Sequence, residues 1–404
     1  MNLYYSLFKN QHLKIAIVVN SFPETSETFI INKVLAMAAK GNSIDVIRLS
    51  CFGNNELSVL YNFSNLENLR IINPRLPSSV ATLLTFFANH PIISFQSFSF
   101  DKKKFYQNIR KKIYGRIFNN SRYDIIHFEY SGIAASLVDI IENIKAKTVV
   151  SCRGSAEKVK LITEKGRREK IEKVFKIISA VHCVSEDMKK TIAPFCTDLN
   201  KVFVNRPAID VSFFKPSGEK KKNGVLQILS VGRFTYQKGY LTGLMAIREI
   251  VAKGRSFVWN IIGDGPQYEE ILFHIHNMAL ENHVKLLGRR NKDEVNSLLA
   301  AADIFLLTSV YEGIPNVVLE AMAMELPVVA TRSGGVDEVI TNGKDGFVAD
   351  VYDVHEIIRL VELLLSDENL RVSIGKEARK RILLDYTLER QAQVFQSRYQ
   401  SLLT

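Results

Sequence analysis

Short apolar runs alternate along the chain with longer segments in which apolar residues recur every three or four positions. An apolar run at 14–20 is followed by a helical pattern that stops at Gly41, and a second apolar run occupies 44–49. This order predicts the opening of a parallel, doubly wound sheet. Similar short runs predict further strands at 125–128, 148–151 and 180–184. The first half of the chain is therefore predicted to form one Rossmann-like domain.

The alternation restarts after a polar, loop-forming segment at 207–224, which has the character of a linker. Strands are then predicted at 225–231, 257–262, 284–287, 304–308 and 327–330, and helices at about 241–253, 267–280, 292–301, 315–324 and 354–365. A last helical pattern at 387–403 has no strand after it. We therefore expect an α/β protein with a domain at 1–212, a second doubly wound domain at 213–385, and a C-terminal helix at 386–404 that packs back on the first domain.

Charge separates the two halves. The 404 residues carry a net charge of +11, yet residues 1–215 hold 31 Lys and Arg against 18 Asp and Glu, whereas residues 216–404 hold 22 against 24. A basic half suits nucleic acid, an anionic membrane surface or a phosphorylated substrate. The overall composition, with 47% hydrophobic and 24% charged residues, excludes a disordered, collagen-like or coiled-coil chain.

The four cysteines show neither CxxC pairs nor metal-ligand spacing, so we expect no disulfide framework and no zinc site, and a reduced cytoplasmic setting. The apolar run near the N-terminus is too short for an export signal. The most apolar later window, 80–100, is interrupted by polar residues. A membrane-spanning helix is therefore not expected.

Two cations follow the first strand of the second domain. Arg233 comes directly after that strand, and Lys238 precedes the next helix. Ligands of open α/β sheets bind at the carboxyl ends of strands, and an Arg fork with a Lys point charge suits a diphosphate whose charge grows as it leaves. The alternative is a pair of solvated cations on a loop.

Two carboxylates follow the predicted strand at 304–308. Glu312 lies on a loop and Glu320 lies about a turn and a half into the next helix, so both reach one crevice. Carboxylates accept hydrogen bonds from sugar and ribose hydroxyls. Glu320 fits poorly as a solvated helix residue because its neighbours are apolar, and a buried carboxylate needs a partner. Gly313 allows close approach of the backbone, and Pro315 opens a helix whose first amides point towards a ligand.

These motifs together resemble retaining glycosyltransferases of family 4, which have the GT-B fold, and in particular members that build exopolysaccharides and other surface glycans. On the donor side the resemblance rests on Gly232-Arg233 with Lys238-Gly239, Gly263-Asp264-Gly265-Pro266, Glu312 with Glu320, and Ser333-Gly334-Gly335 with Glu338. In the first half it rests on Ser21-Phe22-Pro23, on the segment 26–30, on 124–127 and on Val184-Ser185-Glu186.

The resemblance implies two Rossmann-like domains that face each other across a crevice, with the nucleotide-sugar donor held by the second. Arg233 and Lys238 would bind the diphosphate and stabilise the leaving phosphate, and Glu320 would bind the ribose. Glu312 and the backbone that follows it would hold the sugar. The implied donor-binding residues are Gly232, Arg233, Lys238, Gly263, Gly265, Glu312, Gly313, Ile314, Pro315, Asn316 and Glu320. No metal and no other cofactor is expected, since the two cations replace one and no convincing Asp-x-Asp motif is present.

On the acceptor side the implied catalytic residues are His127 and Glu129, and the sequence does not decide which of the two faces the acceptor hydroxyl. Many relatives have a second His where this chain has Glu129, and a His where it has Arg153. A hydrogen-bonded core histidine is an equal alternative for His127, and a structural salt bridge is an equal alternative to anion binding for Arg153. Acceptor or phosphate contacts are also expected from the segment Ser26, Glu27 and Thr28.

A basic segment at 102–122 holds eight cations and no acid, with apolar residues at i, i+4 spacing. Such a helix is typical of an anionic membrane interface, and the alternative is a domain helix with a solvated basic face. Aromatic residues between the cations would also stack on nucleobases, but no nucleic-acid fold accompanies them. The membrane contacts are expected from Lys102, Lys103, Lys104, Arg110 and Lys111.

The sequence therefore predicts a bacterial, cytoplasmic glycosyltransferase, peripheral on the inner face of the membrane. It would move a sugar from a nucleotide-diphosphate donor to a lipid-linked or growing glycan in polysaccharide synthesis. The alternative is a non-catalytic partner of the same fold that binds a polyprenyl-linked glycan or another transferase. A nicotinamide oxidoreductase is disfavoured because neither strand–helix opening carries GxGxxG.

Overall fold

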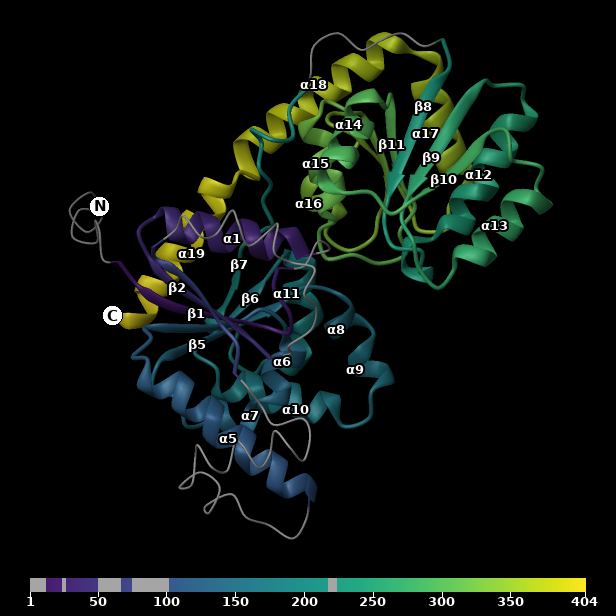
Figure 1. Ribbon diagram of the computed structural model, residues 1–404. Coiled ribbons are helices and arrows are strands. Elements are labelled where there is room, and N and C mark those ends of the chain that lie inside the picture. The colour runs from purple at the N-terminus through teal and green to yellow at the C-terminus, as the bar shows by residue number, and fades with distance from the viewer. Residues whose placement is uncertain (1–11, 24–26, 50–66, 75–101, 217–223) are drawn as a thin grey trace. The chain divides into compact units, whose positions relative to one another are not determined.

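The chain folds into two compact α/β units. The computed structural model describes residues 12–23, 27–49, 67–74, 102–216 and 224–404 (Figure 1). Unit 1 comprises Met1–Cys183, Thr191–Phe203 and Ala392–Thr404, and unit 2 comprises Val184–Lys190 and Val204–Gln391. Each unit contains one sheet with helices around it, so the predicted pair of Rossmann-like, doubly wound domains is confirmed.

The sheet of unit 1 has seven strands in the order β3-β2-β1-β4-β5-β6-β7. Their bounds are β1 Lys14–Val19, β2 Ser43–Arg48, β3 Leu69–Ile72, β4 Ile125–Phe128, β5 Lys147–Cys152, β6 Ala180–Cys183 and β7 Val202–Val204. The strand order reverses between β1 and β4, which pair in parallel with Ile17 opposite His127. Ligands of doubly wound sheets bind outside the carboxyl ends of the strands at such a reversal.

The helices of unit 1 cover both faces of this sheet. They are α1 Thr28–Ala39, α5 Lys102–Asn120, α6 Ser131–Ser136, α7 Val138–Ile141, α8 Ser155–Lys158, α9 Lys160–Thr163 and α10 Arg167–Ile177. The last helix of the chain, α19 Leu388–Leu403, lies beside α1 (Figure 1). Its Phe395 and Tyr399 are buried in the same cluster as Ile30 and Val34 of α1. Unit 1 therefore needs the last residues of the chain to complete its core.

The basic helix α5 presents its apolar side to unit 1. Ile109, Tyr114 and Phe118 are buried, and the ring of Phe118 packs edge-on against Phe128 of β4. An apolar face used in this way does not insert into a bilayer, and the buried Tyr114 does not stack on a nucleobase. Of the predicted apolar stripe, Ile109 is buried and Phe105, Ile113 and Ile117 are half-buried, so the domain core takes up part of it. The expected membrane contact of this helix stays a prediction. The side chains of Lys102, Lys103 and Lys104 lie outside the described residues.

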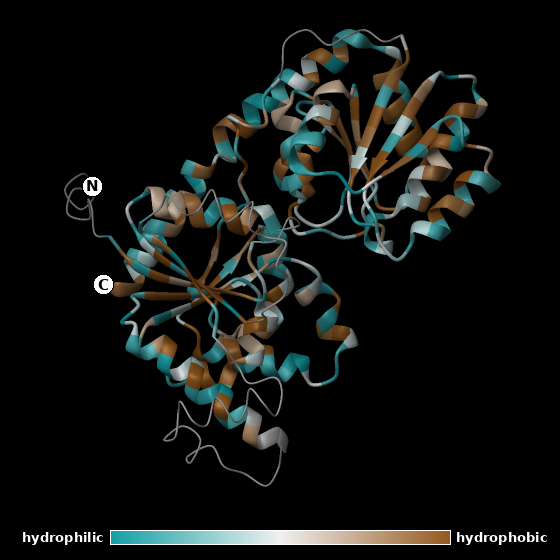
Figure 2. Ribbon diagram, viewed as in Figure 1, coloured by the Kyte–Doolittle hydropathy of each residue, from teal (hydrophilic) through white to brown (hydrophobic). Residues whose placement is uncertain are grey.

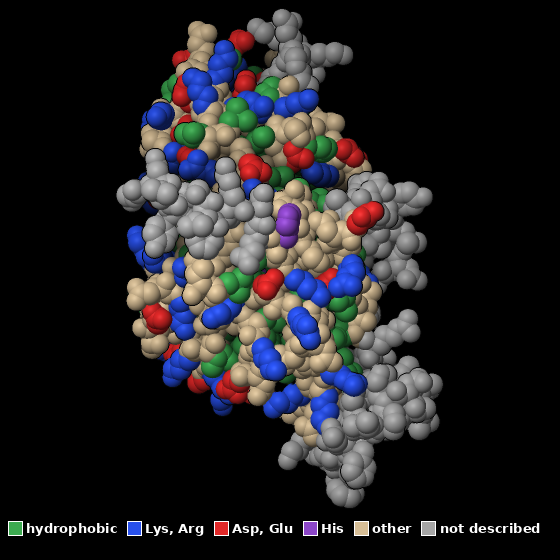
Figure 3. Space-filling model, turned by 90° about the vertical axis from the view of Figure 1, so that its left-hand side faces the viewer, with side chains coloured by type: hydrophobic (Ala, Val, Ile, Leu, Met, Phe, Trp, Pro, Cys, Tyr) green, Lys and Arg blue, Asp and Glu red, His purple; other side chains and the backbone are tan. Residues whose placement is uncertain are grey.

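A basic outer surface remains on unit 1. Lys111 and Arg116 of α5 are exposed, and Arg110 is partly exposed and donates to Ser136 Oγ at 3.2 Å. Lys and Arg side chains are spread over the lower part of the face shown in Figure 3, with few acidic ones among them. Within the described part of the chain, no helix is both long enough and apolar enough to span a bilayer.

The sheet of unit 2 has six parallel strands in the order β10-β9-β8-β11-β12-β13. The strands are β8 Leu226–Val231, β9 Phe257–Ile262, β10 Val284–Gly288, β11 Ile304–Leu307, β12 Val328–Thr331 and β13 Phe347–Ala349. The helices are α11 Glu186–Ile192, which begins here and ends in unit 1, α12 Tyr240–Ala252, α13 Tyr268–Asn277, α14 Lys292–Ala301, α15 Asn316–Ala323, α16 Val336–Val339, α17 Val354–Ser366 and α18 Glu368–Asp385.

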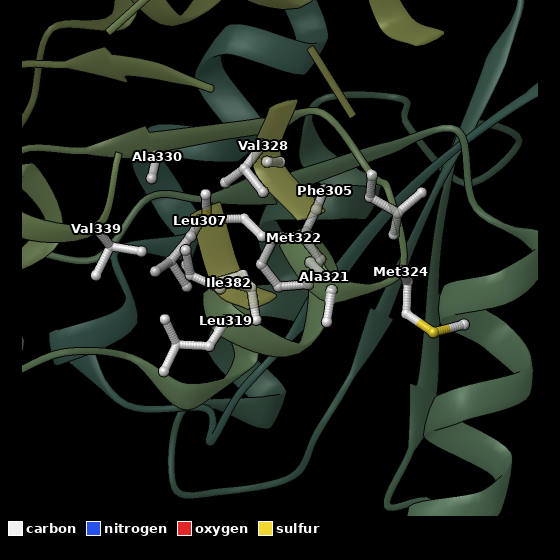
Figure 4. Packing of buried hydrophobic residues seen from close by; sticks show 14 of the residues in the cluster. Phe305, Leu307, Leu319, Ala321, Met322, Met324, Val328, Ala330, Val339 and Ile382 are labelled. Atoms are coloured by element: carbon white, nitrogen blue, oxygen red, sulfur yellow. The ribbon is translucent and has the colours of Figure 1, made fainter. Parts of the chain in front are cut away.

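The strands of unit 2 are mostly apolar, with isolated polar residues in β8, β9 and β10, and its helices turn apolar sides to the sheet (Figure 2). Helix α15 is the most enclosed example. Leu319 and Met322 of α15 pack among Phe305 and Leu307 of β11, and Ile382 of α18 closes the cluster from outside (Figure 4). Because α15 is buried so completely, the loop that joins β11 to its first turn has a fixed position.

Candidate active site

The loop after β8 brings two cations to the edge of the unit 2 sheet. Arg233 follows Gly232 at the strand end, and Lys238 closes a single 3₁₀ turn before α12. Gly239 joins that turn to α12 with a φ of +59°, and a Cβ built on it would lie 2.2 Å from the carbonyl oxygen of Thr308. Only glycine allows this approach. The loop after β8 is thereby held against the end of β11.

Lys238 and Glu312 meet at this junction. Lys238 Nζ lies 2.7 Å from Glu312 Oε1, and both side chains are largely buried. The carboxylate of Glu312 also accepts from Ser309 Oγ at 2.8 Å and from Gln237 Nε2 at 3.3 Å. Three donors from two loops therefore fix Glu312. Ser309 and Gln237 were not identified from the sequence, because neither belongs to a recognisable motif. The available signal was that Gln237 is adjacent to Lys238 and that Ser309 lies three residues before Glu312.

Arg233 is exposed and forms no ion pair with any described residue. Its loop is lined by the glycines after β9. A Cβ on Gly263 would lie 2.0 Å from the carbonyl oxygen of Gly232, and one on Gly265 would lie 2.5 Å from that of Phe234. Asp264 accepts from the amide of Gly265 at 2.8 Å and so stabilises its own turn. The structure thus gathers Gly232, Arg233, Gly263 and Gly265 at one edge.

The segment after Glu312 leads directly into α15. The carbonyl of Gly313 accepts from the amide of Gly335 at 2.7 Å, which joins two of the motifs noted in the sequence. Pro315 has an extended conformation, so α15 begins at Asn316, one residue later than predicted. The side chain of Ile314 is buried in the core of unit 2. Any contact of Ile314 with a ligand would therefore come from its backbone.

Glu320 lies one and a half turns into α15. Burial raises the pKa of its carboxyl group to about 7, against a weaker opposing effect of Lys292. Among the described residues no side chain or backbone group forms a hydrogen bond or ion pair with this carboxylate. The Glu320 side chain is half-buried. A partly desolvated carboxylate without a partner costs free energy, which hydroxyl groups of a ligand would recover.

His127 and Glu129 are both fully buried in unit 1. His127 Nε2 lies 2.7 Å from Ser151 Oγ, and its Nδ1 lies 2.6 Å from the hydroxyl of Tyr399. Burial and the nearby charge of Lys33 lower the pKa of His127, so the ring is neutral. The structure therefore places both residues together, but neither at the surface. The arrangement of His127 is that of a hydrogen-bonded core histidine, and a catalytic role for either residue stays a prediction.

Lys33 was missed by the sequence reasoning. It lies on α1 with its ammonium group 2.5 Å from Glu129 Oε1 and 3.0 Å from His127 Nδ1. Burial lowers its pKa to about 8, against the raising effect of Glu129. Burial also opposes ionisation of Glu129, but the charges of Lys33 and its neighbours hold the pKa of Glu129 well below its usual range. The available signal for Lys33 was its position on the predicted helix, three residues after Ile30 and therefore on the apolar face.

Arg153 lies at the end of β5 and reaches Glu129. Its guanidinium forms an ion pair with the Glu129 carboxylate, donates through Nε to the Glu129 carbonyl at 3.1 Å, and lies 4.5 Å from the centre of the Phe29 ring. Glu27 accepts from the hydroxyl of Tyr130 at 2.7 Å, and Thr28 is the first residue of α1. Ser26 lies outside the described residues.

Within the described residues, no group of three or more His, Cys, Asp or Glu is placed to hold a metal ion. The described cysteines, Cys152, Cys183 and Cys196, are free and buried.

Comparisons with known proteins agree with these motifs. The putative colanic acid biosynthesis glycosyltransferase WcaL of Escherichia coli K12 is 25% identical over 391 residues, which cover 93% of this chain and 96% of the relative. An Escherichia coli UDP-Gal:α-D-GlcNAc-diphosphoundecaprenol α-1,3-galactosyltransferase is 25% identical over 297 residues, covering 68% of this chain and 74% of the relative.

Solved structures match the fold. HepE of Anabaena, crystallised with UDP-glucose, superimposes with a TM-score of 0.74 at 17% identity, covering 96% of this chain and 100% of the other. Residues 212–381 match the family described as Glycosyl transferases group 1. That match contains Arg233, Lys238, Glu312 and Glu320, and the WcaL relative extends it over nearly the whole length. Residues 212–381 therefore match the group 1 glycosyltransferase family, and the chain over nearly its whole length has the GT-B fold and is similar to exopolysaccharide-type glycosyltransferases, as its motifs predicted.

Proposed function

We propose that this glycosyltransferase uses a nucleotide-diphosphate sugar as donor, retains the anomeric configuration and needs no metal ion. The observation that carries the proposal is the meeting of Lys238 with Glu312 beside the exposed Arg233, at the carboxyl ends of β8 and β11. Two cations at a strand edge suit a diphosphate, and a carboxylate beside them suits a sugar hydroxyl.

Each residue has a separate task in this proposal. Arg233 and Lys238 bind the diphosphate, and their attraction grows as negative charge develops on the departing phosphate. Glu312, fixed by Ser309 and Gln237, orients the donor sugar, and Glu320 accepts from the ribose hydroxyls. The acceptor hydroxyl then attacks from the face on which the diphosphate leaves, so the configuration is retained. No protein-held metal enters these steps.

The acceptor that we propose is a lipid-linked or growing glycan. The galactosyltransferase relative is named for a diphosphoundecaprenol-linked acceptor, and the WcaL relative for colanic acid biosynthesis. We further propose that the chain works on the inner face of the cytoplasmic membrane. The basic outer surface of unit 1 supports an electrostatic association with anionic lipid.

The test is a transfer assay with a panel of nucleotide sugars and a polyprenyl-diphosphate-linked sugar as acceptor, in buffer with and without EDTA. We expect turnover with one donor, unchanged by EDTA and lost in Lys238→Ala. Lys253→Ala is the matched control, because Lys253 also pairs with a glutamate, Glu362 at 2.8 Å, but on the outer helices of unit 2. Binding of a nucleotide sugar without hydrolysis or transfer would favour the non-catalytic alternative.

A further inference from the structure

A cluster of three charged residues crosses the core of unit 1 and ends at its surface. Lys33 and Glu129 are buried, Glu129 is shared between Lys33 and Arg153, and only Arg153 keeps an exposed part, 13% of its side chain. We call these residues the unit 1 charge cluster. Since His127 is neutral, the cluster holds two positive charges against one negative charge.

The guanidinium of Arg153 is held on several sides. Glu129 binds it through the side chain and the carbonyl, and Phe29 lies against its face. The backbone is held too, because the buried Glu157 accepts from the amides of Arg153 and Gly154, each at 3.1 Å. A group fixed before binding loses little conformational entropy when a ligand arrives.

One edge of the Arg153 guanidinium has no hydrogen-bond partner among the described residues. Glu129 occupies Nε and Nη2, while Nη1 forms no hydrogen bond to any described residue and is not among the buried unpartnered nitrogens of the described chain. Nη1 therefore faces solvent. Among the described residues, Glu129 is also the sole ion-pair partner of Arg153. Arg153 thus offers free N–H groups, and its partner Glu129 is shared with Lys33.

Stability alone does not account for this arrangement. Burying an ion pair costs desolvation energy that the attraction barely repays, and a third, unbalanced charge adds to the cost. The cluster lies at the carboxyl ends of β4 and β5, on the side of the sheet where α/β proteins bind ligands. Clusters of strongly perturbed charges in such places are typical of functional sites.

We propose that Arg153 binds an oxyanion of the acceptor substrate, a phosphate or a sugar carboxylate, and that Glu129 and Glu157 are positioning residues for it. This inference rests on the proposed glycosyl transfer to an acceptor. The planar guanidinium fork presents paired N–H donors to two oxygens of one oxyanion, which a lysine ammonium does not do. The bound oxyanion balances the excess positive charge of the unit 1 charge cluster.

The experiment uses the full chain saturated with UDP, so that the donor site is filled. Calorimetric titration with inorganic pyrophosphate and, separately, with glucuronate then tests for a second site and distinguishes phosphate from carboxylate. We expect one of the two to bind, and Arg153→Gln to weaken that binding by about 10-fold to 100-fold. The affinity of Arg153→Lys should lie between those of the unchanged chain and of Arg153→Gln, since lysine keeps the charge and loses the planar fork of N–H donors.

The controls separate the two proposals. Arg168→Gln, which removes an exposed arginine of unit 1 paired with Glu172, should bind like the unchanged chain. Retained UDP binding shows that unit 2 of each variant is folded, and an unchanged circular dichroism spectrum shows the same for the whole chain. Phe29→Leu leaves every charge in place and should weaken binding of the oxyanion several-fold. If neither UDP nor any other nucleoside diphosphate binds, the proposed function fails. If UDP binds but neither oxyanion does, or Arg153→Gln binds equally well, the oxyanion site is overturned.

Discussion

Lys238 Nζ lies 2.7 Å from Glu312 Oε1, and the two residues come from loops 74 positions apart. The cation assigned to the diphosphate and the carboxylate assigned to the sugar therefore form one unit before either meets a substrate. A donor that engages Lys238 must share it with Glu312, and in doing so it brings its sugar to the carboxylate.

The first prediction concerns this pair. Lys238→Ala should lower kcat by about 100-fold to 1,000-fold, because a cation aimed at developing charge acts mainly in the transition state. Glu312→Gln should lower kcat less, since the amide still hydrogen-bonds to a sugar hydroxyl. Steady-state kinetics on both variants, with Lys253→Ala as control, measures the effect. Equal kcat values in Lys238→Ala and in the control would show that Lys238 does not take part in the reaction.

The second prediction concerns pH. Glu320 has a pKa of about 7 in the folded chain against 4.5 for the ordinary group, so the folded state holds an extra proton between these values. Stability therefore falls as the pH rises through this window, and Glu320→Gln should remove about 1–3 kcal/mol of that fall. Urea unfolding at pH 5 and pH 8 measures it. Glu269→Gln, on the exposed side of α13, should behave like the unchanged chain.

The same carboxyl group predicts a change in ligand affinity. If Glu320 accepts from ribose hydroxyls, UDP should bind more tightly at pH 8 than at pH 6, because only the ionised form accepts through both oxygens. Calorimetry with the unchanged chain and with Glu320→Gln tests this. A pH dependence that persists in the glutamine variant would assign it to another group.

The third prediction concerns Gly239. Gly239→Ala should destabilise the chain by about 2 kcal/mol or more and abolish transfer, since the new Cβ would overlap the Thr308 carbonyl oxygen. Gly254→Ala is a close control: that glycine has a φ of +76° but no atom within 4 Å of the built Cβ. It should cost about 1 kcal/mol and leave activity intact. Equal losses in both variants would mean that the conformation, and not the loop contact, matters.

The fourth prediction concerns the unit 1 charge cluster. Lys33→Met leaves Glu129 with one partner fewer in a buried site, and should cost about 3–5 kcal/mol of unfolding free energy. The double variant Lys33→Met with Glu129→Gln should recover part of this loss. Arg168→Gln, which breaks a pair with Glu172 whose side chains are 60% and 35% exposed, should cost about 1 kcal/mol or less. Chemical denaturation compares all three.

The fifth prediction concerns the membrane. We expect binding to anionic vesicles that falls as salt rises, and that is lost when Lys102, Lys103 and Lys104 are changed to Glu. The buried apolar side of α5 leaves charge as its means of attachment. Liposome flotation with anionic and neutral vesicles is the measurement, and equal recovery with neutral vesicles would contradict an electrostatic mode.

The alternation of strands and helices in both units could be predicted from the sequence, because most strands are short apolar runs bounded by polar residues. Three strands were not predicted: β7 and β13, with three residues each, are too short to produce such a run, and Arg70 interrupts the apolar run of β3. The donor loops were likewise predictable, since Gly232, Lys238 and Glu312 each follow a strand. The contact of Gly239 with Thr308 was not, because it depends on the spacing of β8 and β11 in the folded sheet.

The unit 1 charge cluster could not be assembled from the sequence. Lys33 lies on α1, whereas Glu129 and Arg153 follow β4 and β5, and nothing local in the sequence shows that the three side chains meet. The same difficulty applied to α5, where the spacing of Phe105, Ile109 and Ile113 suits a bilayer and a domain core equally. Only the buried position of Ile109 decides between these two environments.

The path of α19 has a consequence for how the protein is made. Phe395 and Tyr399 complete the core of unit 1, yet they leave the ribosome only after all of unit 2 has been synthesised. Throughout that interval the face of α1 that Phe395 and Tyr399 cover in the folded unit is uncovered. The same holds for Lys33 and His127, which contact these two residues. An N-terminal fragment that ends before α19 should therefore not fold alone, and a co-expressed α19 peptide is the natural reagent to rescue it.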